Sequence, residues 1–532
     1  MKDIAQKILL DILKAKPKDN SSFLLLKKKF SGKYGITPVN NATLIRAYGQ
    51  MSEKEKNKYP RLDNFMNKRK TRTLSGVTPL TVLTKPYPCP GNCTYCPHEP
   101  GMPQSYLSNE PAAQRAKLNN FDAIKQVKMR IKALETNGHE VDKIELLILG
   151  GSFNAYPKSY QKNFIKQCFD TANKKSSNPL SGSKTLDEAF KKNETAKHRI
   201  IGVTIETRPD LITEQEVKWF RDLGVTRVQI GVQHLDDKIL KRVKRGHTTE
   251  QTIKATRLLK QVGLKVDYHI MPDLPGSTPQ KDLQVFKELF ASENFQPDQL
   301  KIYPTVINEY APLYKEFKTG KHKPYSEKKL LHLLLKIKLS IPYYVRINRL
   351  IRDIPKESII AGNSITNLRQ FLQKELKKQK KSCKCMRCRE AREQINDIKK
   401  AKLFMQKYRA SKGLEYFISF ESPKRDKLYS FIRFRINDEN QNFISELNNA
   451  SLVREIHTYG QLVSNRKSNR RGLISKRIQH TGFGKRLMKE AEKLTKKHGL
   501  NKIAVISGIG VRPYYKKQGY RLEGTYMVKY NL

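Results

Sequence analysis

The sequence predicts an α/β protein in which a partial parallel (β/α)6 barrel is followed by a separate C-terminal α/β domain and preceded by a basic helical extension. Short apolar strands alternate with helical periodicity from about residue 76 to 342, and strands dominate residues 412–532. Residues 1–75 and the connector at 343–411 are basic and prone to form helices. A chain of 532 residues is also too long for one ordinary core.

The charge balance favours a polyanionic partner. Lys and Arg number 104 against 50 Asp and Glu, a formal net charge of +54, which is far beyond what solubility requires. RNA or DNA is the better interpretation, and a general excess of Lys is the alternative. Basic clusters at Lys27–Lys29 and Lys68–Lys70 lead us to assign the first 75 residues to RNA binding.

We expect a soluble, cytoplasmic protein without membrane contact. The opening helix places Ile4, Ile8 and Ile12 on one face but carries acidic residues where an export signal has an unbroken apolar core. The most apolar later stretch, Leu330–Ile341, is interrupted by charged side chains, so nothing approaches the ~20 apolar residues of a membrane span.

Five predicted strands follow one that precedes Cys89, and helical segments separate them. They are Ile144–Leu149, Ile200–Ile205, Val225–Val232, Lys265–Met271 and Leu300–Tyr303. Alternation of strand and helix is typical of a parallel barrel with its chemistry at the C-terminal strand ends. Residues 174–197 are rich in Lys, Ser and Asn and are interpreted as a surface loop or a disordered insertion.

Six of the seven cysteines form two groups of three, which suits metal ligation in a reducing compartment. The seventh, Cys168, lies on the apolar side of a predicted helix and is expected to be a buried structural thiol.

Cys89, Cys93 and Cys96 lie in PYPCPGNCTYCPHEP, directly after the first predicted strand. Three cysteines at this spacing hold a 4Fe-4S cluster with one open iron, to which S-adenosylmethionine binds. Electron transfer to that molecule gives a 5′-deoxyadenosyl radical. The alternative is a zinc knuckle with His98 as fourth ligand.

Residues at later strand ends agree with an S-adenosylmethionine site. Gly150 and Gly151 end the second strand, where small residues permit close backbone approach. Glu206 and Gln233 end later strands. The alternatives are a plain glycine turn and a local Glu206–Arg208 ion pair.

The C-terminal region contains a second signal. Predicted strands are Tyr416–Phe420, Tyr429–Ile436, Leu452–Thr458 and Ile503–Ser507, with a helix over Phe483–His498. QHTGFG at Gln479–Gly484 matches the Q/R-x-x-G-x-G/A loop of GNAT acetyltransferases, in which backbone N–H groups at a helix start bind the coenzyme A pyrophosphate. A plain capping turn is the alternative. Tyr514 and Tyr515 follow where that fold places a residue near the thioester.

From about residue 75 the chain resembles the Elongator catalytic subunit family, which joins a radical SAM domain to a GNAT domain. The motifs that carry the resemblance are YPCPGNCTYCPHEPG, LGGSFNAYP, TIETRPD, LKIYPT, VREIHTYG, QHTGFGKRLMKEAE and GVRPYYKKQGYRLEGTYMVKY. The cysteine spacing is of the bacterial and archaeal type, which suggests action without other Elongator subunits.

The resemblance implies that acetyl-CoA loses a methyl hydrogen to the deoxyadenosyl radical and is joined to carbon 5 of the wobble uridine in a tRNA anticodon stem-loop. Thioester hydrolysis then leaves a carboxymethyl group, and an electron donor is needed. Acetyl-CoA would contact Lys143, Glu455, Ile456, His457, Thr458, Phe483, Gly484, Lys485 and Tyr515. Gln479 and Gly482 would lie near its phosphates, and Lys301 and Tyr514 are further active-site candidates.

The resemblance also implies structural zinc at Cys383, Cys385 and Cys388 between the two domains, with a metal-free loop as the alternative. Two other functions stay open. One is a protein lysine N-acetyltransferase with a structural iron-sulfur cluster, in which Glu455 or His457 serves as base. The other is a non-catalytic tRNA-binding scaffold.

Overall fold

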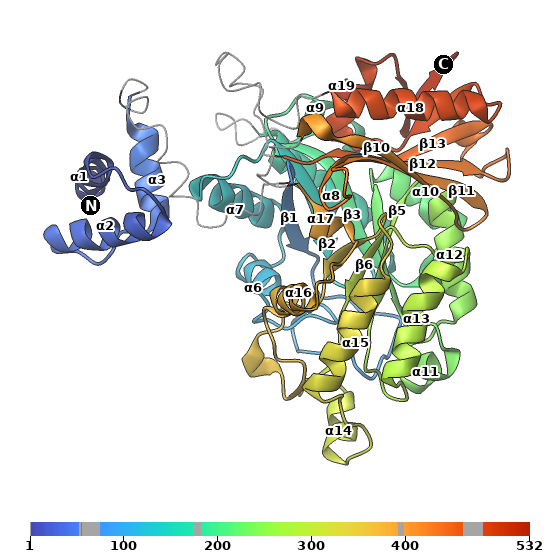
Figure 1. Ribbon diagram of the computed structural model, residues 1–532, viewed down its shortest axis with the longest axis horizontal. Helices are drawn as coiled ribbons and strands as arrows, with labels where there is room; N and C mark the ends of the chain where they lie inside the picture. Colours follow the sequence, from blue (N-terminus) through green and yellow to red (C-terminus); the bar gives the residue numbers. More distant parts are fainter. Residues whose placement is uncertain (1, 53–54, 56–74, 175–181, 392–397, 461–481) are drawn as a thin grey trace.

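The computed structural model describes residues 2–52, 55, 75–174, 182–391, 398–460 and 482–532. A parallel sheet with its helices occupies the middle of the molecule, and a second sheet lies across one end of it (Figure 1). Three N-terminal helices stand to one side, next to α7.

The parallel sheet is an open barrel with the order β1-β2-β3-β4-β5-β6-β8, and all neighbouring strands are parallel. This confirms the predicted partial barrel. The strands are β1 Thr78–Leu83, β2 Lys143–Leu149, β3 Arg199–Thr207, β4 Arg227–Gln233, β5 Lys265–Ile270, β6 Gln299–Ile302 and β8 Arg346–Arg349. β8 comes from the segment that we assigned to the connector, so the sheet has one strand more than predicted. A two-stranded ribbon of β7 Val306–Ile307 and β9 Ala361–Gly362 is separate.

Helices cover the outer face of the barrel, because their apolar sides pack on strands rich in β-branched residues. None of the helices that the structure describes is long and apolar enough to cross a membrane. The helices of this region are α6 Pro111–Leu118, α7 Ala123–Thr136, α8 Lys158–Asn173, α9 Leu186–Asn193, α10 Glu214–Asp222, α11 Asp237–Arg242, α12 Thr249–Gln261, α13 Pro279–Ala291, α14 Leu313–Lys318, α15 Glu327–Ser340, α16 Leu368–Lys378 and α17 Met386–Arg389.

Helix α8 confirms one prediction and α9 corrects another. Cys168 on α8 is fully buried in the core, as predicted. The interpretation of residues 174–197 as a loop or disordered insertion is wrong where α9 forms, because Thr185 caps its N-terminus and Phe190 packs edge-on against Phe169 with 4.7 Å between ring centroids. Residues 175–181 lie outside the described residues.

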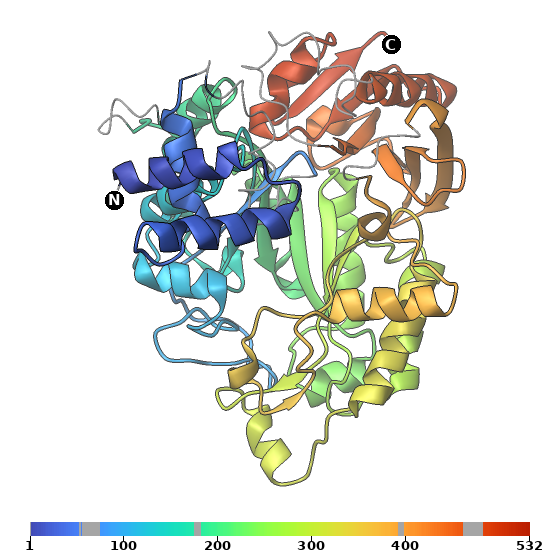
Figure 2. The same cartoon turned by 60° about the vertical axis from the view of Figure 1, so that its left-hand side comes forward.

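The N-terminal helices α1 Lys2–Lys14, α2 Asn20–Lys33 and α3 Asn41–Gln50 share a small core of their own. Ile8 and Ile12 of α1 are fully buried in it, which confirms the amphipathic opening helix. Side chains of Asp19 and Asn40 cap the starts of α2 and α3. In Figure 2 these helices lie outside the barrel, and the basic cluster Lys68–Lys70 falls outside the described residues.

The C-terminal sheet has the order β10-β11-β12-β13-β14-β16-β15, with β13–β14 as its parallel pair. Its elements are β10 Lys402–Arg409, β11 Gly413–Glu421, β12 Leu428–Asn437, β13 Ala450–Thr458, α18 Phe483–Lys497, β14 Lys502–Val505, α19 Arg512–Lys516, β15 Arg521–Glu523 and β16 Tyr526–Tyr530. The four predicted strands and the predicted helix are therefore present. β10, β15 and β16 were not predicted.

A buried ionic cluster joins the C-terminal sheet to the barrel. A register shift in the β12–β13 pairing leaves Arg454 without a partner residue on β12, and such a bulge redirects a side chain. Arg454 donates to Asp298 at 2.6 Å and to Glu415 at 2.9 Å, and all three side chains are fully buried. This contact fixes the C-terminal domain against the N-terminal ends of the barrel strands.

Candidate active site: two cavities of one barrel

The three cysteines of the first group line a cavity of about 570 Å³ at the C-terminal ends of the barrel strands. The loop that carries them is held in place by backbone hydrogen bonds, Cys96 N to Cys93 O at 3.1 Å and Thr94 N to Val243 O at 3.0 Å. His98 is exposed, and its Nε2 lies 2.9 Å from the Gln104 amide. His98 therefore does not join the three thiols, which disfavours the zinc-knuckle alternative.

Burial raises the pKa of the Cys96 thiol to about 12. A buried thiolate needs positive charge nearby, and a metal centre supplies it. Part of that charge comes from Arg245, which donates from Nη1 to Cys93 Sγ at 3.5 Å and is anchored on Gly231 O. Sequence reasoning missed Arg245, because no motif distinguishes it from the other basic residues of KRVKRGH. The donor set fits an iron-sulfur cluster with a hydrogen bond to one of its thiolates.

Gly150 and Gly151 both have left-handed backbone, with φ of +131° and +97°. A Cβ at Gly150 would lie 2.0 Å from Thr84 Oγ1, so no larger residue fits there. Gly151 borders the cavity beside Ser152. The glycine pair therefore lets the end of β2 turn tightly at the cysteine-lined cavity.

Glu206 and Gln233 also line this cavity. Glu206 accepts from Tyr106 Oη at 2.6 Å, and Lys301 Nζ lies 3.4 Å from it. The alternative Glu206–Arg208 pair is not found, since Arg208 instead pairs with Asp210 at 2.9 Å. Lys301, a further active-site candidate, is buried and also donates to Gln229.

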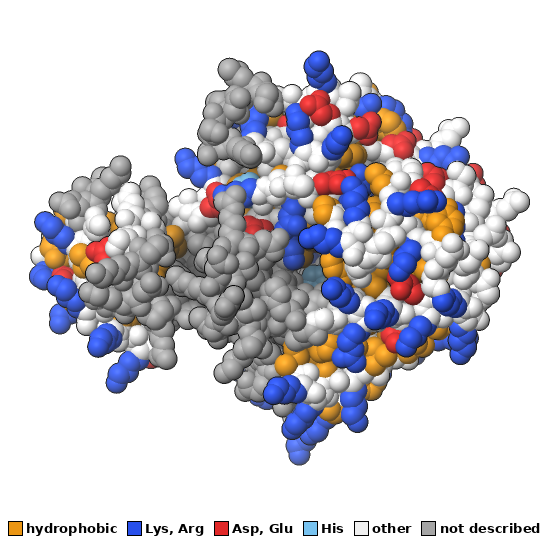
Figure 3. Space-filling view, turned by 90° about the horizontal axis from the view of Figure 1, so that it is seen from above, with side chains coloured by type: hydrophobic (Ala, Val, Ile, Leu, Met, Phe, Trp, Pro, Cys, Tyr) orange, Lys and Arg blue, Asp and Glu red, His pale blue; other side chains and the backbone are white. Residues whose placement is uncertain are grey.

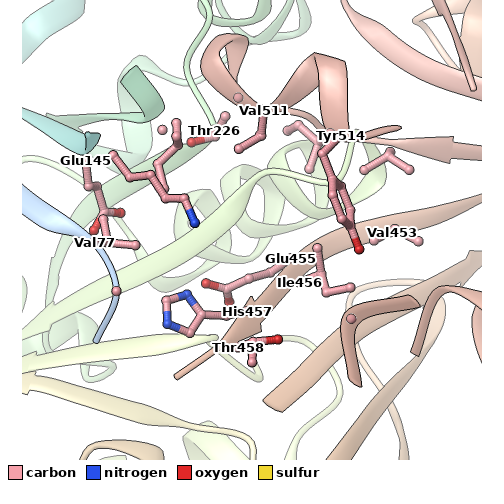
Figure 4. Close-up of a pocket in the computed structure, with 18 of the residues that line it drawn as sticks. Val77, Glu145, Thr226, Val453, Glu455, Ile456, His457, Thr458, Val511 and Tyr514 are labelled. Carbon is pink, nitrogen blue, oxygen red and sulfur yellow. The ribbon is translucent and has the colours of Figure 1, made fainter. Parts of the chain in front are cut away.

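A second cavity of about 780 Å³ lies between the N-terminal ends of the barrel strands and the C-terminal domain (Figure 4). β13 pairs with β14 over residues 450–453 and beyond them only with β12, so β13 and β14 part and residues 455–458 line the cavity. Most residues predicted to contact acetyl-CoA line it, namely Lys143, Glu455, Ile456, His457, Thr458, Gly484, Lys485 and Tyr515, together with Gly482 and Tyr514.

Two predicted residues are placed differently. The Phe483 side chain is buried and stacks on Phe420 with 4.4 Å between ring centroids, so it packs in the domain core and does not line the cavity. Gln479 lies outside the described residues.

Helix α18 begins beside this cavity. Gly482 at its N-cap has φ +76° and open space around its Cβ position. A Cβ at Gly484 would lie 3.0 Å from Tyr514 Oη. N–H groups at such a helix start attract phosphate oxygens, and the missing side chains allow the phosphates to come close.

Glu455 and His457 are the two candidate bases of the lysine acetyltransferase alternative, and their surroundings shift their pKa values for different reasons. Burial opposes ionisation of Glu455, but Lys265 and Arg433 outweigh it and hold the pKa of this carboxyl at about 2. Burial lowers the pKa of His457, whose Nε2 lies 2.9 Å from Ser75 O. A carboxylate held this firmly by cations is a weak base, which disfavours Glu455 in the lysine acetyltransferase alternative. Burial also lowers the pKa of Lys143 at the cavity edge.

The second cysteine group lies between α16 and β10, with Cys388 on α17. The sulfur atoms of Cys383, Cys385 and Cys388 lie within 4.8 Å of one another, and this is the metal-compatible group of three that the described residues contain. Lys338 Nζ and Gln373 Nε2 lie 3.6 and 3.5 Å from Cys388 Sγ. Three thiols at this separation can share one metal ion.

Family models match both halves of the chain. Residues 87–289 match the radical SAM superfamily, 297–378 a radical SAM C-terminal domain, and 421–530 a GNAT acetyltransferase domain. A protein of Methanocaldococcus infernus named tRNA uridine(34) acetyltransferase is 41% identical over 99% of each chain. The chain belongs to the family of Elongator catalytic subunits and tRNA uridine(34) acetyltransferases. Human Elongator complex protein 3 is 37% identical over 86% of this chain and 85% of its own length.

A solved structure of this family agrees with the fold. The archaeal Elp3 of Methanocaldococcus infernus, with an N-terminal deletion, is 39% identical and matches 86% of this chain and 100% of its own with a TM-score of 0.73. This member of the family is thus an acyltransferase-class enzyme that carries a radical SAM domain and a GNAT domain in one chain.

Proposed function

We propose that this enzyme carboxymethylates carbon 5 of the wobble uridine in tRNA, using acetyl-CoA and a radical generated from S-adenosylmethionine. The observation that carries the proposal is that one barrel borders both the cysteine-lined cavity and the second cavity, beside the start of α18, which we call the GNAT cavity. Relatives named tRNA uridine(34) acetyltransferase support the choice of substrate.

Cys89, Cys93 and Cys96 would hold a 4Fe-4S cluster, since their thiols line a shared cavity that has a hydrogen-bond donor at Cys93. When bound, the cluster would supply the electron that cleaves S-adenosylmethionine to a 5′-deoxyadenosyl radical. Gly150 and Gly151 would admit the methionyl end close to the backbone, and Glu206 and Gln233 would contact the rest of the molecule.

The GNAT cavity would hold acetyl-CoA. Gly482 and Gly484 leave the N–H groups at the start of α18 accessible to pyrophosphate, and Lys485 would lie near the phosphates. Lys143 reaches this cavity from the barrel, so the coenzyme would contact both domains. Tyr515 and residues 455–458 would flank the acyl end.

Binding of tRNA is supported by charge. Lys and Arg side chains are spread over the face in Figure 3, and acidic side chains are fewer there. A flexible anticodon loop can splay out its wobble base and present it to a cavity. We also propose that the reaction takes place in the cytoplasm, needs an external electron donor and proceeds without other Elongator subunits.

We further propose structural zinc at Cys383, Cys385 and Cys388. Their converging sulfur atoms support it. Replacing Cys385 by Ser should lower the zinc content of the purified protein and its melting temperature, as measured by elemental analysis and thermal unfolding. A wild-type protein without bound metal would favour the metal-free loop.

The decisive experiment is an anaerobic incubation of the reconstituted enzyme with tRNA, acetyl-CoA, S-adenosylmethionine and a reductant, followed by nucleoside mass spectrometry. A carboxymethyl group on uridine 34 is the expected result. Acetylated protein lysine with unmodified tRNA would favour the acetyltransferase alternative, and unmodified tRNA that still binds would favour the scaffold.

A further inference from the structure

The interior of the barrel is hollow along its length and carries many polar side chains among the apolar ones. Every second residue of several strands lines the cysteine-lined cavity, from the N-terminal strand ends to the C-terminal ones. They are Val77, Pro79, Thr81; Glu145, Leu147, Leu149; Arg227, Gln229, Gly231, Gln233; His269, Met271; Lys301, Tyr303; and Arg346, Asn348. Full barrels of this type normally fill with branched apolar side chains, so this interior is unusual.

The polar side chains inside the barrel hold one another in fixed positions. Asn348 donates to Asp267 at 2.8 Å and to Gln299 at 2.6 Å, and Lys301 bridges Gln229 and Glu206. His269 lines the hollow, and its buried Nε2 makes no hydrogen bond to the residues that the structure describes. A buried polar atom left this way is costly in a simple core, which points to a polar molecule that occupies the hollow.

The two cavities meet at one ring of residues. Ser75, Val77, Glu145, Arg227 and Arg346 line both of them. We call these five residues the waist. They lie at or close to the N-terminal ends of β1, β2, β4 and β8. Figure 4 shows Val77 and Glu145 at one edge of the view and Tyr514 at the other, with His457 between them.

Hydrogen bonds make one side of the waist rigid. Arg227 donates to Glu145 and Gln299, both at 2.8 Å, and to Thr204 at 3.0 Å. Arg346 at the start of β8 pairs with Glu390 at 2.5 Å. Ser75 and Val77, which precede β1 next to β2, add only short side chains. Hydrogen bonds and ion pairs therefore hold the waist in shape, and a larger side chain at residue 77 would narrow any passage between the two cavities.

We propose that the barrel is a channel, and that the acetyl end of acetyl-CoA passes through the waist to meet the 5′-deoxyadenosyl radical inside it. This rests on the proposed function. β2 spans Lys143–Leu149, so its ends, one in each cavity, lie about 20 Å apart at ~3.3 Å per residue. Reacting atoms must approach to about 3–3.5 Å, so one reactant must enter the barrel.

The step inside the channel is the transfer of one hydrogen atom. One C–H bond of the acetyl methyl group breaks and one C–H bond forms at the 5′ carbon, so the unpaired electron moves to the acetyl carbon. No proton or electron is gained or lost in this step.

Substitutions at Val77 test the channel, because larger side chains there should plug the waist. The reconstituted full-length enzyme is given tRNA, S-adenosylmethionine, reductant and acetyl-CoA with a trideuterated methyl group. Three quantities are measured: 5′-deoxyadenosine formed without acetyl-CoA, acetyl-CoA affinity by calorimetry, and deuterium in 5′-deoxyadenosine. Val77→Trp should lower deuterium transfer roughly 100-fold, the scale of a 1 Å misplacement of reactants, and should lower it far more than it lowers the other two quantities.

Val77→Ala is the matched control and should transfer deuterium as the wild-type enzyme does. If Val77→Trp does not fold, Val77→Leu and Val77→Phe should show a loss that grows with side-chain size. Deuterium transfer that is unchanged in the plugged variants would overturn the channel alone. A wild-type enzyme that makes 5′-deoxyadenosine and binds acetyl-CoA but transfers no deuterium would overturn the proposed function, and the channel with it.

Discussion

Cys96 is one of three thiols that line a single cavity, and an open-iron cluster needs all three thiolates. Replacing Cys96 by Ser should therefore abolish formation of 5′-deoxyadenosine by the anaerobically reconstituted protein, measured by chromatography. Cys168→Ala is the matched control, because Cys168 is buried in α8 away from both cavities. A Cys96→Ser variant that cleaves S-adenosylmethionine at the normal rate would contradict the assignment.

The hydrogen-bond partners of single residues could not be predicted from the sequence. The strand-end position of Glu206 marks it as a cavity residue, but its neighbour Arg208 is not its partner. Tyr106, a hundred residues earlier, donates to it instead. Arg245 reaches Cys93 across 152 positions in the same way. Such partners depend on which loops the barrel brings together, and no local pattern records that.

At the scale of elements, the start of α18 should bind the coenzyme. Gly484→Asp places a carboxylate and added bulk beside Tyr514 Oη, where a phosphate is expected. Repulsion and the lost attraction of the helix end should weaken acetyl-CoA binding by about tenfold or more, as measured by calorimetry.

The matched control for the α18 start is Lys489→Asp, which changes charge on the exposed side of the same helix. It should leave the affinity nearly unchanged, and both variants should keep the visible absorbance of the cluster. Equal affinities for Gly484→Asp and the wild-type enzyme would make the loop an ordinary helix cap.

Long periodic elements were predictable and short ones were not. The strands β2 and β3 contain apolar runs, β4 and β5 alternate apolar with polar residues, and α18 has a clear amphipathic pattern, so hydrophobic periodicity identified them. β8 has only the four residues Arg346–Arg349, and arginines at both ends hide its pairing with β6. α9 lies in a Lys- and Asn-rich segment whose composition suggested a loop. Three apolar residues on one face of this helix are nevertheless buried in the core.

The whole molecule depends on the ionic cluster between its two domains. Burial opposes ionisation of Asp298, but Arg454, Lys260 and Arg433 hold its pKa below the ordinary range. Asp298→Asn would leave these buried cations short of one negative charge and should lower the free energy of unfolding by about 3–5 kcal/mol. Because the pKa is lowered on folding, this stabilisation is present above pH about 4 and is lost as the pH falls further.

Denaturant unfolding of Asp298→Asn and of Asp438→Asn measures this effect. Asp438 pairs with Arg409 at the surface, where such a pair contributes about 0–1 kcal/mol. Equal losses in the two variants would mean that the buried cluster does not stabilise the domain contact.

The N-terminal helices should strengthen tRNA binding electrostatically. The formal charge of +54 exceeds any need of folding, and α1–α3 have a core of their own, so the barrel should remain folded without them. Each phosphate that a cation neutralises releases counterions, which lowers log affinity by roughly 0.7–0.9 per tenfold rise in salt. Deleting residues 1–52, which removes α1–α3 and keeps Ser75 of the waist, should therefore weaken tRNA binding and flatten its salt dependence.

A double substitution in α2 tests the positive charge of the N-terminal helices without removing the helices themselves. Lys28→Glu with Lys29→Glu changes two exposed residues of α2 and should reduce the salt slope while the helices stay folded by circular dichroism. Formation of 5′-deoxyadenosine without tRNA should survive in both proteins, because the cysteine-lined cavity contains no residue of α1–α3. If the truncated protein binds tRNA with the same affinity and salt slope as the full chain, the RNA site must lie on the barrel and the connector, where the arginines around the mouth of the cysteine-lined cavity would be the next cations to test.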